Sequence, residues 1–190
     1  YQAEVAQGRL EALLNYQTVI CDLTGMELSN ASLLDEGTSA AEAMTMLFSN
    51  RTREKVNSNC NKFFVADDIF DQTLDVLLTR AEPLGIEIIK NSIDKINIDE
   101  GFFGCYVQYT GKNGQIHDLK SISKILSNFD IKLVVGADLL SLCILEKPSL
   151  FNCDVVVGTS QRFGIPLGYG GPHAGYYATK KQYKRSMPGR

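Results

Sequence analysis

Short and nearly continuous apolar runs alternate with amphipathic segments along this chain, and this alternation constrains its fold more than any other feature. The runs at 62–67, 132–138 and 154–160 read KFFVAD, KLVVGAD and DVVVGTS. Strands with apolar side chains on both faces are typical of parallel sheets that are covered by helices on each side. We therefore expect an α/β three-layer sandwich with a mainly parallel sheet.

The other segments fit the same plan. Apolar side chains with helical spacing over 2–24, followed by Gly25, predict an amphipathic helix with a glycine stop. We expect a short extended piece near 27–34, strands at 85–90, 104–110 and 175–180, and helices over 40–48, 72–83 and 116–129.

The length of 190 residues suits one domain, and no internal repeat or linker divides the chain. The chain opens on Tyr1 rather than Met and stops at Arg190 without a terminal signature, so we expect a piece of a longer protein. We expect no second complete domain in residues 1–190.

Composition excludes several classes of protein. Hydrophobic residues at 44% and charged residues at 22% exclude a disordered tail. A net charge of -3 offers no footprint for nucleic acid, and no apolar run reaches the roughly 18 residues that span a membrane. The five cysteines are odd in number and lack C-x-x-C spacing, so we interpret them as buried thiols in a reducing compartment, without a disulfide framework or metal site.

Ligands of open parallel sheets bind beyond the carboxyl ends of the strands, which directs attention to two short segments. Thr38 and Ser39 open a helix, where free N–H groups suit a phosphate or carboxylate; the alternative is an ordinary cap, and Asp35 and Glu36 would repel an anion. Asp138 follows a strand and could hold the protonated pyridine nitrogen of pyridoxal phosphate, or simply cap the segment after it.

A third segment, 158–175, reads GTSQRFGIPLGYGGPHAG. Five of the sixteen glycines fall within twelve residues of it, which indicates a loop with unusual torsions or a close approach to something else. Together with YQAEVAQGRLEALLNYQT, NASLLDEGTSAAEA and KRSMPGR, this segment resembles the glycine decarboxylase family, the P-proteins of the glycine cleavage system, in their long single-chain form. The resemblance spans nearly the whole chain.

The resemblance implies a tandem of two type I pyridoxal-phosphate folds, with the Schiff-base lysine only in the C-terminal one. This chain resembles the large-domain portion of the N-terminal half, where the lysine position reads Gln161. A carboxamide nitrogen has no free lone pair and cannot form an imine, so we expect no catalytic residue here and no covalently bound cofactor. Thr38, Ser39 and Asp138 would be remnants of a cofactor site. The family commonly has His-Pro where this chain has Phe70-Asp71, which argues against a ring-stacking histidine.

The implied parent activity is that of an oxidoreductase of glycine catabolism. It releases CO2 from glycine on pyridoxal phosphate and passes the aminomethyl group to the lipoyl arm of H-protein. The implied partners are glycine, the C-terminal half of the same chain, a second subunit of a homodimer and lipoylated H-protein. The compartment would be the bacterial cytoplasm or the mitochondrial matrix. This portion would be a non-covalent scaffold and a wall of the active-site crevice, inactive alone.

The residues expected to face that crevice are Tyr1, Arg162, Tyr169 and His173. Arg162 could steer a carboxylate or the lipoyl carboxamide, although we favour a hydrogen bond to the loop backbone. The loop 169–173 could contact substrate or pack against the sister half, and we interpret His117 as a surface histidine. Two other functions stay open: a free-standing enzyme domain that binds a small phosphate or carboxylate through Thr38, Asp138 and Gln161, and a module that presents the glycine-rich loop to a protein partner.

Overall fold

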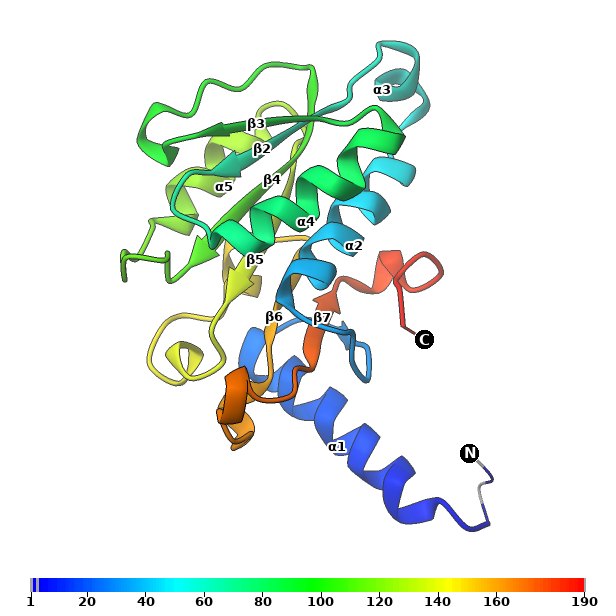
Figure 1. Ribbon diagram of the computed structural model, residues 1–190. Coiled ribbons are helices and arrows are strands. Elements are labelled where there is room, and N and C mark those ends of the chain that lie inside the picture. The colour runs from blue at the N-terminus through cyan, green and yellow to red at the C-terminus, as the bar shows by residue number, and fades with distance from the viewer. Residues whose placement is uncertain (1, 3, 190) are drawn as a thin grey trace.

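The computed structural model describes residues 2 and 4–189, and these form one seven-stranded sheet with flanking helices (Figure 1). The strand order is β1-β7-β6-β5-β4-β2-β3. The strands are β1 Leu28–Ser29, β2 Lys62–Ala66, β3 Glu87–Asn91, β4 Phe102–Tyr109, β5 Lys132–Ala137, β6 Val155–Thr159 and β7 Gly175–Thr179. The α-helices are α1 Gln7–Thr24, α2 Glu36–Ser49, α3 Arg53–Asn57, α4 Asp71–Ala81 and α5 Leu119–Ser127.

Five neighbouring strands, β3, β2, β4, β5 and β6, run parallel, whereas β7 and β1 are antiparallel to their neighbours. Two antiparallel strands need no long crossover, and the glycine-rich segment between β6 and β7 is short enough to join them directly. The expected mainly parallel sheet is confirmed. Because the five parallel strands end together, the segments after β4, β5 and β6 meet at one edge, which we call the carboxyl edge.

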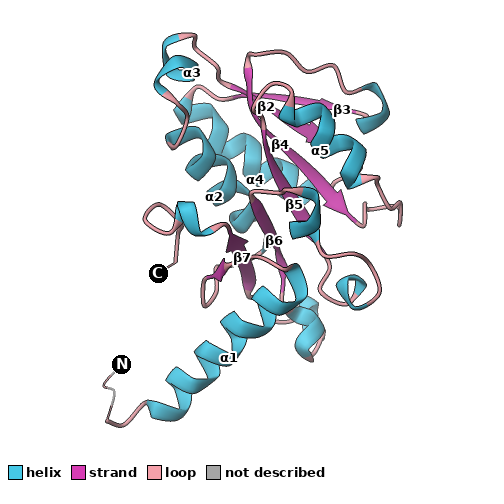
Figure 2. Cartoon of the chain, turned by 180° about the vertical axis from the view of Figure 1, so that it is seen from behind, coloured by secondary structure: helices cyan, strands magenta, loops and turns pink. Residues whose placement is uncertain are grey.

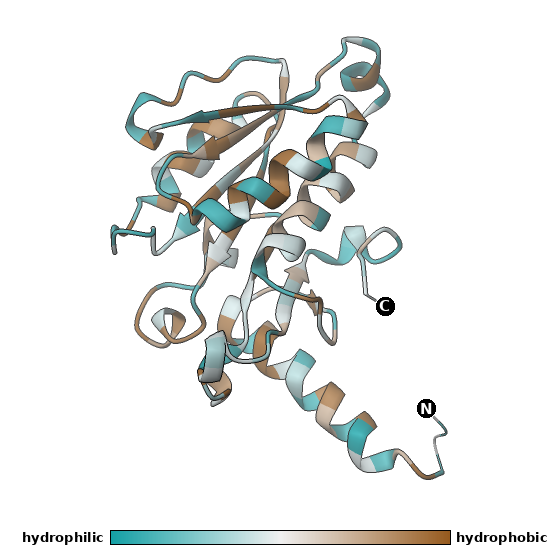
Figure 3. Ribbon diagram, viewed as in Figure 1, coloured by the Kyte–Doolittle hydropathy of each residue, from teal (hydrophilic) through white to brown (hydrophobic). Residues whose placement is uncertain are grey.

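Helices cover both faces of the sheet, so the three-layer sandwich is confirmed. Helices α2 and α4 pack side by side on one face, and α5 covers the other (Figures 1 and 2). The central strands between them are buried almost completely, and apolar colouring follows them in Figure 3. This explains why the strand sequences alternate so little: neither face meets water.

Helix α1 ends where the sequence predicted but starts later. Gly25 closes it in the left-handed region at φ 74°, with its N–H donated to the Cys21 carbonyl, while the first helical residue is Gln7 rather than residue 2. The C-terminal turns pack near β1 and β7, and the rest extends away from the sheet (Figure 1). Leu14 on the extending part is 64% exposed, so only part of the apolar stripe is buried in this chain. Among the described residues, no helix combines the length and apolar character that a membrane span requires.

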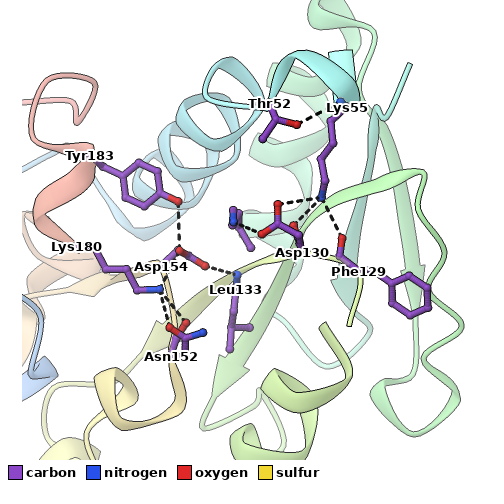
Figure 4. Close-up of polar contacts among 10 residues, drawn as sticks. Thr52, Lys55, Phe129, Asp130, Leu133, Asn152, Asp154, Lys180 and Tyr183 are labelled. Atoms are coloured by element: carbon purple, nitrogen blue, oxygen red, sulfur yellow. Dashed lines mark hydrogen bonds and ion pairs between the residues drawn. The ribbon is translucent and has the colours of Figure 1, made fainter. Parts of the chain in front are cut away.

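A buried carboxylate fastens the opposite, amino edge of the sheet (Figure 4). Asp154 accepts hydrogen bonds from the Leu133 N–H at 3.0 Å, Lys180 Nζ at 3.0 Å and the Tyr183 hydroxyl at 3.2 Å. These partners come from β5, from the end of β7 and from the turn after it. Burial raises the pKa of Tyr183, with Asp154 as the next cause, so the phenol stays protonated and donates.

The centre of the sheet depends on a strand residue without a side chain. A Cβ on Gly136 in β5 would collide with the Tyr106 hydroxyl and would lie 2.9 Å from Gln108 Oε1. That hydroxyl donates to Gln108 Oε1 at 3.0 Å, and both side chains are buried. Gly136 is therefore required by the close approach of the Tyr106–Gln108 pair rather than by its torsions.

We expect Gly136→Ala to destabilise the fold by about 1–3 kcal/mol, because the added methyl group overpacks a buried and hydrogen-bonded position. Chemical denaturation gives the measurement. Gly8→Ala is the matched control: nothing lies within 4 Å of the place that the added methyl group would take on α1, so helix propensity should stabilise this variant by up to about 1 kcal/mol. A neutral Gly136→Ala would contradict the packing argument.

Candidate functional site

A cleft of about 590 Å³ lies at the carboxyl edge of the sheet. Its walls come from the ends of β4 and β6, from the segments after β4, β5 and β6, from Phe70 just before α4 and from the first residue of α2. The polar side chains in it are Glu36, Gln108, Thr110, Asp138, Thr159, Gln161 and Arg162. This is the position at which open parallel sheets bind ligands.

Asp138 and Arg162 form a forked ion pair inside the cleft. Arg162 Nε lies 3.0 Å from Oδ1 and 3.2 Å from Oδ2 of Asp138, and Nη2 lies 2.8 Å from Oδ2. Oδ1 also accepts the Leu140 N–H at 3.1 Å. Hydrogen bonding to Asp138 raises the pKa of Arg162 further, so this guanidinium is a permanent cation.

The expectation for Arg162 was wrong in its partner, because the side chain binds the Asp138 carboxylate and no contact with the loop backbone is among its described hydrogen bonds. The cap expected for Asp138 does occur, through Leu140. The sequence indicated both residues, but their pairing joins positions 24 apart in the chain and depends on β5 and β6 being neighbours.

Gln161 holds the glycine-rich loop. It begins the 3₁₀ helix Gln161–Phe163 directly after β6, and its Nε2 donates to the Gly170 carbonyl at 2.9 Å. Tyr169, at φ 52°, projects fully into solvent, and His173 is also exposed. Neither Tyr169 nor His173 is among the cleft-lining residues, and Tyr1 lies outside the described residues.

The start of α2 is capped by the chain itself. Asp35 Oδ1 accepts the Thr38 N–H at 2.7 Å, and the Asp35 carbonyl accepts from the Ser39 hydroxyl at 2.8 Å. Ser39 is buried, and neither Thr38 nor Ser39 lines the cleft. The hydrogen bonds therefore match the ordinary cap that the sequence offered as the alternative to an anion site.

Glu36 is the cleft group that the sequence did not single out as a site. Its Oε1 accepts the Gln108 Nε2–H at 3.2 Å, and Gln108 is held in turn by Tyr106. Burial raises the pKa of Glu36 to about 7; the Gln108 hydrogen bond lowers it, and the charges of Asp138 and Asp35 raise it. Glu36 is thus poised to titrate near neutral pH, a property that depends on burial and was not visible in the sequence.

A second departure concerns the exposure of His117: its side chain has a hydrogen-bond partner but is mostly buried rather than on the surface. Its Nε2 lies 2.7 Å from Asp68 Oδ2, and the two side chains are 13% and 7% exposed. The pair fastens the segment after β4 to the end of β2. No group of three or more His, Cys, Asp or Glu side chains in residues 2 and 4–189 could hold a metal ion.

Comparisons with known proteins agree on one family. A family model described as "Glycine cleavage system P-protein" matches residues 1–190. The chain is 55% identical to the glycine dehydrogenase (decarboxylating) of Flavobacterium johnsoniae and 50% identical to that of a Synechocystis species, each over all of this chain. It spans only about a fifth of the length of these curated relatives, 20% and 19%.

Solved structures give the same result. A crystal structure of a glycine decarboxylase (P-protein) of the glycine cleavage system, in inhibitor-bound form, matches with a TM-score of 0.90 and 32% identity, over 100% of this chain and 43% of that one. A putative O-acetylhomoserine (thiol)-lyase from Campylobacter jejuni, which carries a pyridoxyl-lysine, matches at a TM-score of 0.69 over 91% of this chain and 41% of that one. At 14% identity, the second match is a likeness of fold.

The cleft residues do not fit pyridoxal phosphate, the cofactor that the family resemblance implies. Among its described lining residues there is no lysine, and Asp138 already has a cationic partner. Carboxylates of Asp35 and Glu36 lie at the helix start that would receive the phosphate, so charge repulsion opposes an anion there.

We expect Glu36→Gln to stabilise the protein at pH 8 by about 1–3 kcal/mol, because one pKa unit corresponds to about 1.4 kcal/mol. Glu36 has a pKa near 4.5 when unfolded and about 7 when folded. Between these values the folded state keeps a proton that the unfolded state releases, so the free energy of unfolding falls as pH rises, and the Glu36 penalty is complete above pH 7.

Urea denaturation between about pH 4 and pH 8 tests this. The variant should gain stability relative to the natural protein as pH rises through the window and converge with it at the acidic end. Glu11→Gln, at an exposed position on α1, serves as the control and should show no such divergence. Parallel pH profiles for Glu36→Gln and the natural protein would refute the assignment.

Proposed function

Because the chain belongs to the glycine cleavage system P-protein family, we propose that the protein carrying it decarboxylates glycine, and that this chain is its non-covalent scaffold and one wall of the active-site crevice. In this proposal residues 1–190 are the large-domain portion of the N-terminal half. The observation that carries the proposal is the amide side chain of Gln161 between the end of β6 and a glycine-rich loop, at the position where the family resemblance implies a lysine in the other half.

The reasoning from that position is chemical. Imine formation requires a neutral amine, whereas the Gln161 nitrogen is delocalised into its carbonyl and donates to Gly170. The neighbouring Arg162 is permanently protonated and cannot supply a lone pair. The bond-breaking chemistry therefore belongs to the C-terminal half of the parent, where pyridoxal phosphate serves as the electron sink.

In the parent reaction glycine loses CO2, and the aminomethyl group passes to the lipoyl arm of H-protein. We propose that the C-terminal half and a second subunit complete the crevice beside this chain. The relatives described above are bacterial, which favours the bacterial cytoplasm over the mitochondrial matrix.

The surface beside the cleft supports the wall role. Tyr169 is fully exposed, Leu167 is 75% exposed and Phe163 is 47% exposed, and all three belong to the segment after β6. Leu167 lines the cleft, and exposed apolar side chains in one segment are typical of surfaces that meet another part of a protein. The free-standing ligand-binding alternative has less support, because the charged cleft groups already have partners within the chain.

We expect borohydride reduction of the purified holoenzyme, with no cofactor added, to trap pyridoxal phosphate on a lysine outside residues 1–190. Peptide mapping by mass spectrometry locates the adduct. A stoichiometric adduct on any lysine within residues 1–190 would falsify the non-covalent role.

We expect Tyr169→Ala in the full-length protein to lower kcat/KM for glycine decarboxylation by roughly tenfold, equivalent to about 1.4 kcal/mol, with no loss of thermal stability. The Tyr169 side chain is fully exposed, so its removal should not weaken the packing of this chain. Val56→Ala is the control, because Val56 is 52% exposed on α3, before β2 at the amino edge. Equal activity of both variants would exclude Tyr169 from the crevice wall.

A further inference from the structure

We propose that Arg162 is a second barrier that keeps pyridoxal compounds out of this cleft, independent of the missing lysine. The inference rests on the proposed scaffold role and deepens it, because it identifies a residue that acts by occupying a site. Loss of a lysine removes the covalent bond alone, whereas non-covalent binding in the cleft is opposed by a different group.

The acceptor oxygens of Asp138 are already engaged within the chain. A carboxylate at this strand end binds a protonated pyridine nitrogen only if an oxygen lone pair faces the ring. Both oxygens of Asp138 accept from the Arg162 guanidinium, and Oδ1 also accepts the Leu140 N–H. The guanidinium and a pyridinium are both planar cations with N–H donors, so they compete for the same acceptor.

The Arg162 guanidinium is held by two short contacts to Asp138. Its fork makes contacts of 3.0 Å and 2.8 Å to the two oxygens, which is the geometry of a strong charge-assisted pair. The Asp138 side chain is 31% exposed and the Arg162 side chain is 55% exposed, so solvent screens part of the attraction, and a ligand that displaced the guanidinium would have to replace the remainder. The ion pair therefore opposes the binding of any ligand that cannot supply Asp138 with both a positive charge and N–H donors.

The two barriers are separable. Gln161 and Arg162 are adjacent on one 3₁₀ helix but have different partners, the Gly170 carbonyl and the Asp138 carboxylate. Restoring an amine at position 161 would leave the Arg162–Asp138 pair untouched. Substitution at position 161 can therefore introduce an amine, and substitution at position 162 can separately free the Asp138 carboxylate. The contribution of Arg162 can then be measured by itself.

The experiment uses the full-length protein with Gln161→Lys, Gln161→Lys/Arg162→Ala and Gln161→Lys/Arg162→Lys. Each is incubated with pyridoxal phosphate and reduced with borohydride. The introduced amine adds to the aldehyde carbon, water leaves as the C=N bond forms, and hydride reduces that bond to a stable secondary amine. Mass spectrometry of the peptide containing position 161 then separates this adduct from the adduct in the C-terminal half.

The Arg162→Ala double variant should form roughly threefold to tenfold more adduct at position 161 than Gln161→Lys alone, the range expected for a forked but partly exposed ion pair. The Arg162→Lys double variant keeps a cation beside Asp138, and its labelling at position 161 should stay near that of the single variant. The lysine introduced at position 162 is itself an amine, so fragment ions assign each adduct to position 161 or 162. Comparable labelling in all three variants, whether high or low, would overturn the proposal, since Arg162 would then control nothing.

Thermal unfolding of each variant checks that the fold persists, and Arg162→Gln, which keeps a polar side chain but removes the charge, replaces Arg162→Ala if that variant unfolds. The natural protein distinguishes this proposal from the proposed function. An adduct on its residues 1–190 contradicts the scaffold role, whereas efficient labelling of Gln161→Lys alone contradicts only the role of Arg162.

Discussion

One ion pair, between Asp138 and Arg162, joins the two segments of the cleft that follow β5 and β6. The Asp138 carboxylate follows β5 at the carboxyl edge of the sheet. It is partly buried, so a nearby positive charge stabilises it. Arg162 balances that charge from the 3₁₀ helix Gln161–Phe163, which precedes the glycine-rich loop. Without this pair, the segments that follow β5 and β6 would lose the forked contact that joins them across the cleft.

The two edges of the sheet use carboxylates in opposite ways. At the amino edge, Asp154 is 5% exposed and both of its carboxylate oxygens are engaged by donors that belong to the sheet and its flanking turn. Such a group stabilises the fold and is closed to anything outside. At the carboxyl edge, Glu36 and Asp138 keep contact with a cleft, and the pKa of Glu36 is raised to about 7 by its burial. The carboxylate that only stabilises the fold and the carboxylates that face the cleft therefore lie at opposite ends of the parallel strands.

The sequence predicts the architecture well because its signals are local. Continuous apolar runs place β2, β5 and β6 within a residue or two, and Gly25 marks the end of α1 correctly. Side-chain partners are a different matter. Arg162 finds Asp138, and His117 finds Asp68, only through the strand order, which no local pattern encodes. The raised pKa of Glu36 likewise depends on burial beneath neighbouring segments, so composition and spacing could not reveal it.

The glycine in the middle of β5 has a consequence beyond packing. The space that Gly136 leaves empty admits the Tyr106 hydroxyl, which orients Gln108, which in turn donates to Glu36. A line of contacts therefore runs from the interior of the sheet to an acid on the floor of the cleft. A side chain added at position 136 would displace these contacts in turn and would change the acidity of Glu36. The packing of the core and the charge of the cleft therefore depend on the same few atoms.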